Sequence, residues 1–388
     1  MSRFRFNSAM SRFGALSVLC LAACTSNQAG LQENDAGRQE NDAGAGDTTP
    51  LGEGSIVGRI VNFAAVSGND GIEIASLTDV STTGTSDLRL RFRRFDAQNN
   101  AIDDGIEIGR ATSSARTAFG LTMATDGTLR RICWSPNERV VCFEIGPAAG
   151  NAKEIFNDVG VLPTLTYRAG GAWVLAVRPT APNAVAAPEI SLRRLDAITG
   201  SAVGEPVSFP FGEVYFGLPT LFVATPSGYA LVAGATAFLY RLDANLAVVG
   251  SPLDLGMGYW AYGALAATDT RATIGLSLPY GTTILRVDGN AVVSRTGGGG
   301  GGKTGFPVAL IAHGTTFSAA WADTTAAPPG TQLRYFDDID SNAFSAEFST
   351  GPSTAFLLMR LLETKNGIVA LTVGSSTSGG AIVYVQSL

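Results

Sequence analysis

The glycine-rich segment 297–305 carries a spacing that could do chemistry. Gly297 and the triplet Gly302, Lys303 and Thr304 fit the formula Gly-x-x-x-x-Gly-Lys-Thr, in which backbone N–H groups and the lysine hold nucleotide phosphates. Such a loop needs a helix directly behind it, because the helix N-terminus completes the phosphate site. The residues that follow, GFPVALIA, open a β-like run instead. We therefore predict a loop between two strands and no nucleotide binding.

Two further places could hold a metal or a catalytic group. His313 is the single histidine, so it cannot build a multi-histidine metal site, and a Ser-His-Asp triad would have to form around it. The acidic run FDDIDSN (336–342) offers alternate oxygen ligands for calcium. A calcium loop of the EF-hand type would then require Gly and Glu where Ala343 and Ser349 stand. We predict a packed or solvent-facing histidine, a hairpin turn, no metal and no cofactor.

Aromatic residues offer the remaining candidate site. They fall in two segments, GEVYFGLPT (212–220) and GMGYWAYGAL (256–265), which occupy equivalent points of consecutive repeats described below. A shared aromatic surface could stack on a sugar or hold a protein segment, whereas packing between repeats would explain the same residues. The candidate binding residues are Tyr215, Phe216, Tyr259 and Trp260.

A repeat of about 50 residues must position these groups. Five β-like runs end in a turn aspartate, and the double gap after the first leaves room for another copy near Glu144. Each unit holds four short runs with period-2 alternation and Gly, Pro, Asn or Asp turns. The arginine just before each aspartate is predicted to be an exposed partner of the turn. The turn aspartates are Asp96, Asp196, Asp243, Asp288 and Asp337, and the arginines are Arg94, Arg194, Arg241, Arg286 and Arg334.

Four antiparallel strands per unit of this length are typical of a β-propeller blade, and the body divides into about seven units. A β-sandwich or a stacked β-array with accidental periodicity is the alternative. The body resembles bacterial β-propellers in general, and it carries no motif of a named propeller family. The last unit stops after a third strand, and SIVGRIVNF (55–63) matches the fourth strand SAVGEPVSF (201–209) in register. We therefore predict one all-β, seven-bladed propeller in which 55–63 completes the last blade.

The first residues predict export and anchoring. Three arginines precede an apolar run too short to span a bilayer, which is typical of a secretory signal. The run ends in LAAC, which resembles the lipobox of bacterial lipoproteins, and this resemblance implies that Cys24 becomes the lipidated N-terminus. An ordinary cleaved signal is the alternative. The expected parts are a signal peptide (1–23), a lipidated cysteine with a disordered tether (24–54) and the propeller (55–388).

Cys133 and Cys142 lie in two β-like runs joined by a Ser-Pro-Asn turn. A hairpin centred between Asn137 and Glu138 would place them opposite each other, within disulfide reach, and an exported protein is in an oxidising compartment. Two buried free thiols, or another register, remain as alternatives.

The charge balance limits the partners. The net charge of −6 becomes −9 when the three signal arginines are removed, and such an acidic body argues against nucleic-acid binding. The expected function is a cell-envelope lipoprotein held to the membrane through Cys24, whose propeller binds a protein or glycan without catalysis. The alternative is a propeller-based hydrolase or lyase that acts on an extracellular polymer, with carboxylates converging at the ring centre.

Overall fold

The computed structural model describes the parts of the chain given at the end of this paragraph, and these parts contain strands and turns but no helix. None of them therefore forms a helix long and apolar enough to cross a membrane. The compact unit to which they belong runs from Ala45 to Leu388. The described residues are 49–50, 59–81, 85–113, 120–147, 150–178, 189–210, 220–234, 237–256, 262–278, 281–298, 308–313, 316–323, 332–336, 346–349, 358–375 and 381–387.

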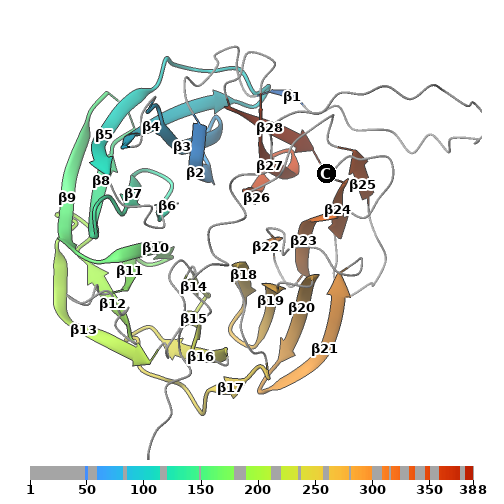
Figure 1. Ribbon diagram of the computed structural model, residues 1–388. Coiled ribbons are helices and arrows are strands. Elements are labelled where there is room, and N and C mark those ends of the chain that lie inside the picture. The colour runs from blue at the N-terminus through green and yellow to red at the C-terminus, as the bar shows by residue number, and fades with distance from the viewer. Residues whose placement is uncertain are drawn as a thin grey trace, which may run out of the picture. The chain divides into compact units, whose positions relative to one another are not determined.

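The described strands form seven four-stranded antiparallel sheets set around a central axis, which is a β-propeller (Figure 1). The predicted fold class and the seven blades are confirmed. Each blade runs from an innermost first strand to an outer fourth strand, in chain order. Blades 1 to 3 are β2 (Arg59–Ser67), β3 (Gly71–Asp79), β4 (Ser86–Asp96) and β5 (Ile106–Ser113); β6 (Leu121–Thr125), β7 (Arg130–Trp134), β8 (Arg139–Ile145) and β9 (Ala152–Val159); β10 (Val161–Arg168), β11 (Ala172–Arg178), β12 (Glu189–Leu195) and β13 (Ala202–Pro210).

The remaining blades follow the same order, except that the fourth strand of blade 7 comes from the beginning of the chain. Blades 4 to 7 are β14 (Leu221–Ala224), β15 (Gly228–Ala233), β16 (Phe238–Asp243) and β17 (Leu253–Asp254); β18 (Tyr262–Ala267), β19 (Arg271–Leu278), β20 (Gly281–Asp288) and β21 (Ala291–Gly298); β22 (Val308–His313), β23 (Thr316–Asp323), β24 (Gln332–Phe336) and β25 (Ala346–Ser349); β26 (Met359–Thr364), β27 (Gly367–Ser375), β28 (Ala381–Ser387) and β1 (Thr49–Pro50).

The ring closes on itself. Each innermost strand contacts the innermost strands of both flanking blades, and β26 of blade 7 contacts β2 of blade 1. The N-terminal strand β1 pairs with β28, with Thr49 opposite Val385 and Pro50 opposite Tyr384. An N-terminal strand therefore completes the last blade, as predicted.

The residues assigned to that closing strand were wrong. The closing strand is β1, which lies in the segment expected to be a tether, whereas 59–63 belong to β2, the innermost strand of blade 1. Residues 55–58 lie outside the described part. Phe63 is fully buried with Ile60 against blade 7, whereas nearly every residue of the matching strand β13 is exposed. The shared period-2 pattern could not distinguish an innermost strand from an outer one, because both alternate.

Burial follows the position of a strand within its blade. The second strands are covered on both faces by neighbouring blades, so β11 and β15 are buried almost throughout and read as continuous apolar runs. Each hydrophobic cluster of the described residues extends across at least one boundary between blades; Trp173 and Leu175 of blade 3, for example, pack on Phe156 of blade 2. The core is therefore a ring of interfaces rather than one central core.

Four of the described fourth strands carry β-bulges. The register to the third strand shifts at β5, β9, β13 and β21. In β9 the extra residue is Ile155. Its side chain packs closely on Gly200 of the next blade, where the Cβ atom of any other residue would lie 2.5 Å from Ile155 Cδ1. Bulges twist an outer strand and interrupt the row of free backbone groups that another strand could pair with. The open edges of these blades are therefore protected.

Candidate functional site

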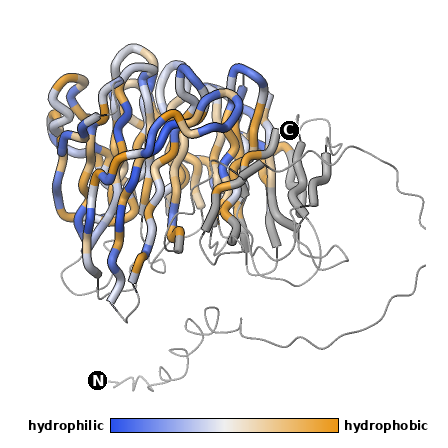
Figure 2. The backbone as a smooth tube through the Cα atoms, turned by 90° about the horizontal axis from the view of Figure 1, so that it is seen from above, coloured by the Kyte–Doolittle hydropathy of each residue, from blue (hydrophilic) through white to orange (hydrophobic). Residues whose placement is uncertain are grey.

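The two faces of the ring are built differently. The turns between first and second strands and between third and fourth strands share one face, which we call the turn face (upper edge in Figure 2). The connections from one blade to the next leave the opposite face, which we call the loop face. Most of the turn face belongs to the described residues, and its charged groups can be assigned individually.

The repeated aspartates cap the turns between third and fourth strands. The Oδ1 atom of Asp96 accepts the N–H groups of Gln98 and Asn100, at 2.9 and 2.8 Å. Asp196 and Asp243 act in the same way toward residues two to four positions ahead. These are Asx turns, in which a carboxylate replaces a backbone acceptor. The acidic run at 336–342, including Asp337, lies outside the described residues.

Turn capping by Asp196 predicts a loss of stability in acid. The N–H and hydroxyl bonds from Thr199 and the N–H bond from Ile198 lower the pKa of Asp196 below its ordinary value. Because the folded-state pKa lies below the unfolded value, this contribution is present at neutral pH and is lost as the pH falls through the folded pKa. An asparagine would keep an Oδ1 acceptor but would not titrate.

We therefore expect Asp196→Asn to reduce the loss of stability between about pH 7 and about pH 3. Chemical denaturation at both pH values measures it. The matched control is Asp104→Asn, because the Asp104 carboxylate is exposed and makes no hydrogen bond among the described residues. If Asp196→Asn and the control lose the same stability between the two pH values, the role of the Asp196 carboxylate in acid sensitivity is contradicted.

The repeated arginines connect neighbouring blades and are not simply exposed partners of their own turns. Arg194 of blade 3 donates to the carbonyl of Ala244 in blade 4, at 3.2 Å. Arg241 of blade 4 donates to the carbonyls of Asp269 and Thr270 in blade 5, at 2.9 and 2.6 Å. Arg94 reaches Pro147 of blade 2 in the same way. The arginine therefore satisfies turn carbonyls of the next blade.

Blade 2 reverses this arrangement. Glu144 stands at the position of the repeated arginine, and Arg131 faces it from the adjacent strand β7. Arg131 is completely buried; it donates twice to Glu144 Oε2 and reaches the carbonyls of Asp196 and Ala197 in blade 3, at 2.9 and 2.7 Å. Its guanidinium also lies 4.6 Å from the centre of the Trp173 ring. In blade 2 the cation therefore stands on the second strand instead of the third, but it still bonds turn carbonyls of the following blade.

The preceding residue, Arg130, points to the other neighbour, because successive side chains of a strand face opposite sides. Its guanidinium forms two 2.6 Å hydrogen bonds with the carboxylate of Glu73 in blade 1, and a third with the carbonyl of Thr128. Both charged side chains are almost fully buried, at 8 and 6% exposure. The pair Arg130–Arg131 therefore links blade 2 to both of its neighbours.

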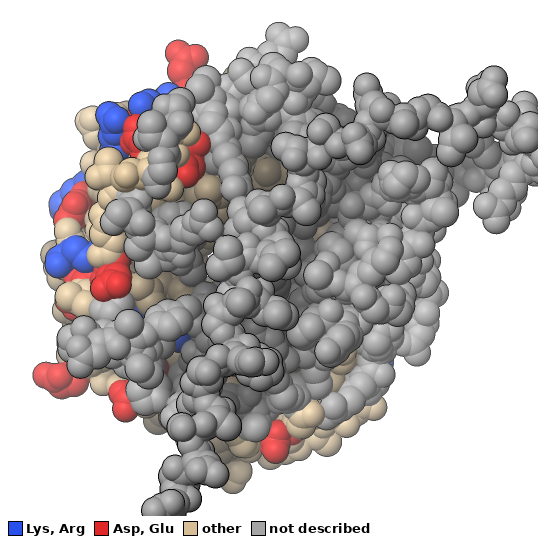
Figure 3. Space-filling model, viewed as in Figure 1, with Lys and Arg blue, Asp and Glu red and all other residues tan. Residues whose placement is uncertain are grey.

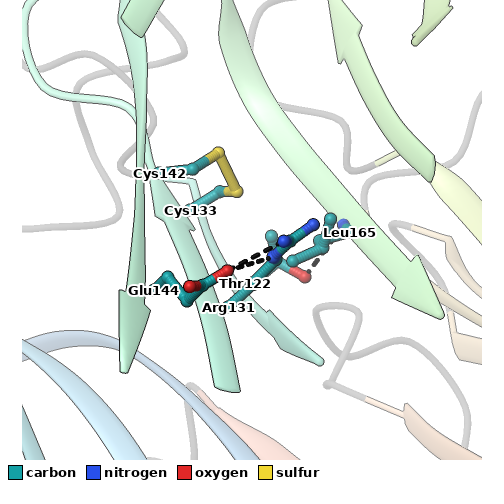
Figure 4. Close-up of a disulfide and its surroundings, with 6 residues drawn as sticks. All are labelled: Thr122, Arg131, Cys133, Cys142, Glu144 and Leu165. Atoms are coloured by element: carbon teal, nitrogen blue, oxygen red, sulfur yellow. Dashed lines mark hydrogen bonds and ion pairs between the residues drawn. A yellow bond between two sulfur atoms is a disulfide. The ribbon is translucent and has the colours of Figure 1, made fainter. Parts of the chain in front are cut away.

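The disulfide lies on the same two strands as Arg131 and Glu144 (Figure 4). Cys133 is directly opposite Cys142, and their sulfur atoms are bonded. Both residues are fully buried in a cluster with Trp173 and Val177 of blade 3. In the same region the hydroxyl of Thr122 accepts the N–H of Leu165, which joins the innermost strands of blades 2 and 3. The interface between these blades thus combines covalent, ionic and polar contacts.

The glycine-rich segment begins inside a strand. Gly297 and Gly298 are the last residues of β21, opposite Thr283 and Thr282. The next described element is the strand β22, as the sequence predicted. Lys303 and Thr304 lie outside the described residues.

His313 ends β22 and is held by its own turn. Its Nε2 atom lies 2.8 Å from the hydroxyl oxygen of Ser318, and its Nδ1 atom lies 3.0 Å from that of Thr316. In blades 4, 5 and 7 the equivalent residue is Thr225, Thr268 or Thr364, and its hydroxyl bonds across the turn. The histidine occupies a turn-capping position, and the described residues contain no group of three or more His, Cys, Asp or Glu side chains that could hold a metal.

The predicted anchor and aromatic surface are not part of the described chain. Cys24, Tyr215, Phe216, Tyr259 and Trp260 all lie outside it. The aromatic pairs belong to the connections between β13 and β14 and between β17 and β18. These connections start from outer strands and lead to innermost strands, so both have their ends at the loop face.

The visible outer wall is of mixed charge. Positive and negative side chains alternate on the side of β5 and β9 (Figure 3). Arg110 pairs with Asp87 at 2.8 Å, and Arg193 pairs with Asp158. These exposed pairs neutralise each other locally, so this part of the wall offers no field of a single sign.

Arginines also stack on aromatic rings of the following blade. Besides Arg131 on Trp173, three such pairs occur among the described residues, each with its guanidinium carbon 5.3–5.9 Å from the ring centre. Two of these arginines, Arg168 and Arg360, come from innermost strands. The arginines at the blade interfaces were not predicted from the sequence; the available signals were the doublet RR in an apolar β-run and the lone arginine of LLMRLL. The three pairs are Arg168–Tyr229, Arg271–Phe317 and Arg360–Phe63.

Comparisons with known proteins bear on the fold alone. No protein-family model matches the chain, and the curated proteins give no significant match. Solved structures do match it, among them one described as the structure of the Dos1 propeller, at 12% sequence identity and a TM-score of 0.49. That match covers 84% of this chain and 77% of the other.

Proposed function

We propose that the protein is a lipid-anchored component of the bacterial cell envelope whose propeller acts as a non-enzymatic binding or scaffold module for a protein or glycan. The acyl chains on Cys24 hold it to the membrane. The partner binds at the loop face, through the aromatic residues Tyr215, Phe216, Tyr259 and Trp260.

The observation that carries this proposal is that the described charged side chains bond to other parts of the ring itself. Aspartates of the turn face cap turns, and arginines and glutamates join blade to blade through pairs such as Arg130–Glu73. The ring is thus a stiff frame whose ionisable groups maintain its own geometry. A stiff frame that presents loops on one face suits recognition, because little ordering entropy is lost on binding.

Removal of the anchor tests the location. We expect Cys24→Ala to move the protein from the membrane fraction to the soluble fraction, because each buried CH2 of an acyl chain contributes about 0.8 kcal/mol to membrane binding. Fractionation and immunoblotting measure it. Cys20→Ala, which changes the other cysteine of the same segment, is the matched control and should leave the protein at the membrane. Membrane retention or lipid labelling of the Cys24 variant would overturn the anchor.

Capture of a partner tests the binding function. Residues 24–388 with Cys24→Ala serve as bait in envelope extract, beside the same chain with Tyr259→Ala and Trp260→Ala. We expect the first chain to retain a partner and the second to lose it, because aromatic anchors contribute the largest share of binding energy. An empty capture by the first chain, together with degradation of an extracellular polymer, would replace this proposal with the hydrolase or lyase.

A further inference from the structure

The innermost strands are nearly free of charge. Their described and partly exposed side chains are mainly Thr, Ala, Val and Leu, as at Thr122, Thr166 and Leu362. The described charged side chains there are the guanidinium groups of Arg168 and Arg360 and the exposed carboxylate of Glu363 near the end of β26. A positive charge at the centre of a protein with a net charge of −6 calls for a physical reason.

Arg360 differs from the buried arginines that join blades 1, 2 and 3. Arg130 and Arg131 each face a carboxylate and also bond carbonyl oxygens. Arg360 donates one hydrogen bond, from Nη1 to the carbonyl of Met359 at 2.8 Å, and it lies 5.4 Å from the centre of the Phe63 ring. In the described part of the chain no carboxylate pairs with it. Among the described residues, most of its five N–H donors therefore have no acceptor.

Such a cation is costly unless something compensates it. Burial lowers the pKa of Arg360, because the surrounding protein removes water that would stabilise the charge. A guanidinium still remains protonated at neutral pH. Its side chain is partly exposed, and none of its nitrogens is among the buried atoms that lack a partner. The N–H groups that lack an acceptor among the described residues thus keep some contact with solvent at the innermost strand of blade 7.

We propose that Arg360 forms a carboxylate-binding site at the innermost strands of blades 7 and 1. The planar guanidinium offers two parallel N–H donors that match the two oxygens of a carboxylate. One guanidinium supplies one positive charge, which balances a monocarboxylate better than a phosphate dianion. The Phe63 ring lies against the guanidinium from the side of blade 1. The ligand is a small organic acid, such as a uronic acid sugar.

This inference rests on the proposed binding function and gives it a ligand class, but the two can fail separately. The capture experiment tests the loop-face aromatics through the Tyr259 and Trp260 variants. The following experiment tests Arg360 without reference to those residues.

Thermal unfolding of residues 24–388 with Cys24→Ala is followed with galacturonate, galactose, acetate and inorganic phosphate. We expect galacturonate and acetate to raise the melting temperature by about 3 °C at saturation, because a ligand that binds the folded state alone stabilises it. Neutral galactose should give no shift. A larger shift with phosphate than with either carboxylate, or no shift with any anion, would overturn the proposal.

Two variants assign the response to Arg360. Arg360→Met should abolish the galacturonate shift while leaving the melting temperature without ligand unchanged or higher, because an apolar residue removes an uncompensated charge. Arg360→Lys keeps the charge but loses the planar fork, so the galacturonate concentration at half-maximal shift should rise about tenfold. Arg271→Met removes an arginine stacked on Phe317 from a second strand and is the matched control. A shift that persists in both Arg360 variants, or that is lost in Arg271→Met, would contradict the site.

Discussion

Replacing Glu73 with alanine should lower the free energy of unfolding by about 3–5 kcal/mol, the usual cost of leaving one member of a buried ion pair alone. Arg130 would keep a single carbonyl bond, to Thr128, and its guanidinium would stay enclosed between blades 1 and 2. Chemical denaturation of the unlipidated chain measures the change. The matched control is Glu107→Ala, whose contact with Arg89 spans 3.9 Å between half-exposed groups and contributes at most about 1 kcal/mol.

The double variant Glu73→Met/Arg130→Met separates the cost of the unpaired Arg130 charge from the cost of lost packing around Glu73. Because the stranded charge causes most of the damage, removing both charges should restore much of the stability. If the double variant is as unstable as Glu73→Ala, packing around the glutamate is responsible and the ionic explanation is wrong.

Replacing Arg131 with methionine should have an effect of similar size, about 3–5 kcal/mol, for a different reason. Glu144 would lose its partner, and the carbonyls of Asp196 and Ala197 would lose their donors at the interface with blade 3. The control is Arg139→Met, because Arg139 bonds Asn157 at the exposed wall of blade 2. Equal losses for the two variants would contradict the role of Arg131.

The other blades suggest a specific rescue for Arg131. In blade 3 the corresponding cross-strand pair is Val174 and Arg194. The double variant Arg131→Val/Glu144→Arg copies that arrangement and should be more stable than the single variant Arg131→Met. A double variant that is less stable than Arg131→Met would show that blade 2 cannot accept the common geometry.

The fold could be predicted from the sequence because it repeats. Each blade is local in the chain, and turn aspartates such as Asp196 and Asp243 mark the end of the third strand at a nearly regular spacing. Closure by an N-terminal strand also followed, because the last unit had three strands. The strand chosen, 55–63, was wrong because its Ser, Val, Gly and Phe positions fit outer and innermost strands equally well.

The contacts that hold the ring together could not be predicted in this way. Arg130 and Glu73 are 57 residues apart, and Arg131 and Ala197 are 66 apart. Each contact depends on which face of a strand points toward the preceding blade and which toward the following one. The alternation of side chains along a strand shows that there are two faces, but it does not show which blade each face contacts. Arg360 was missed for the same reason. The aromatic loop residues remain a prediction.

The arginine doublet of blade 2 has a consequence for how the chain finds its own order. Seven units of similar shape can associate in wrong sequence or with a second molecule, and such misassembly is a characteristic failure of repeat proteins. Arg130 pairs with Glu73 of blade 1, and Arg131 bonds the turn carbonyls of blade 3. A neighbour without acceptors at these positions would leave a buried cation unpaired. The doublet thus favours the docking of blade 2 between blades 1 and 3 over other blade orders while the ring assembles.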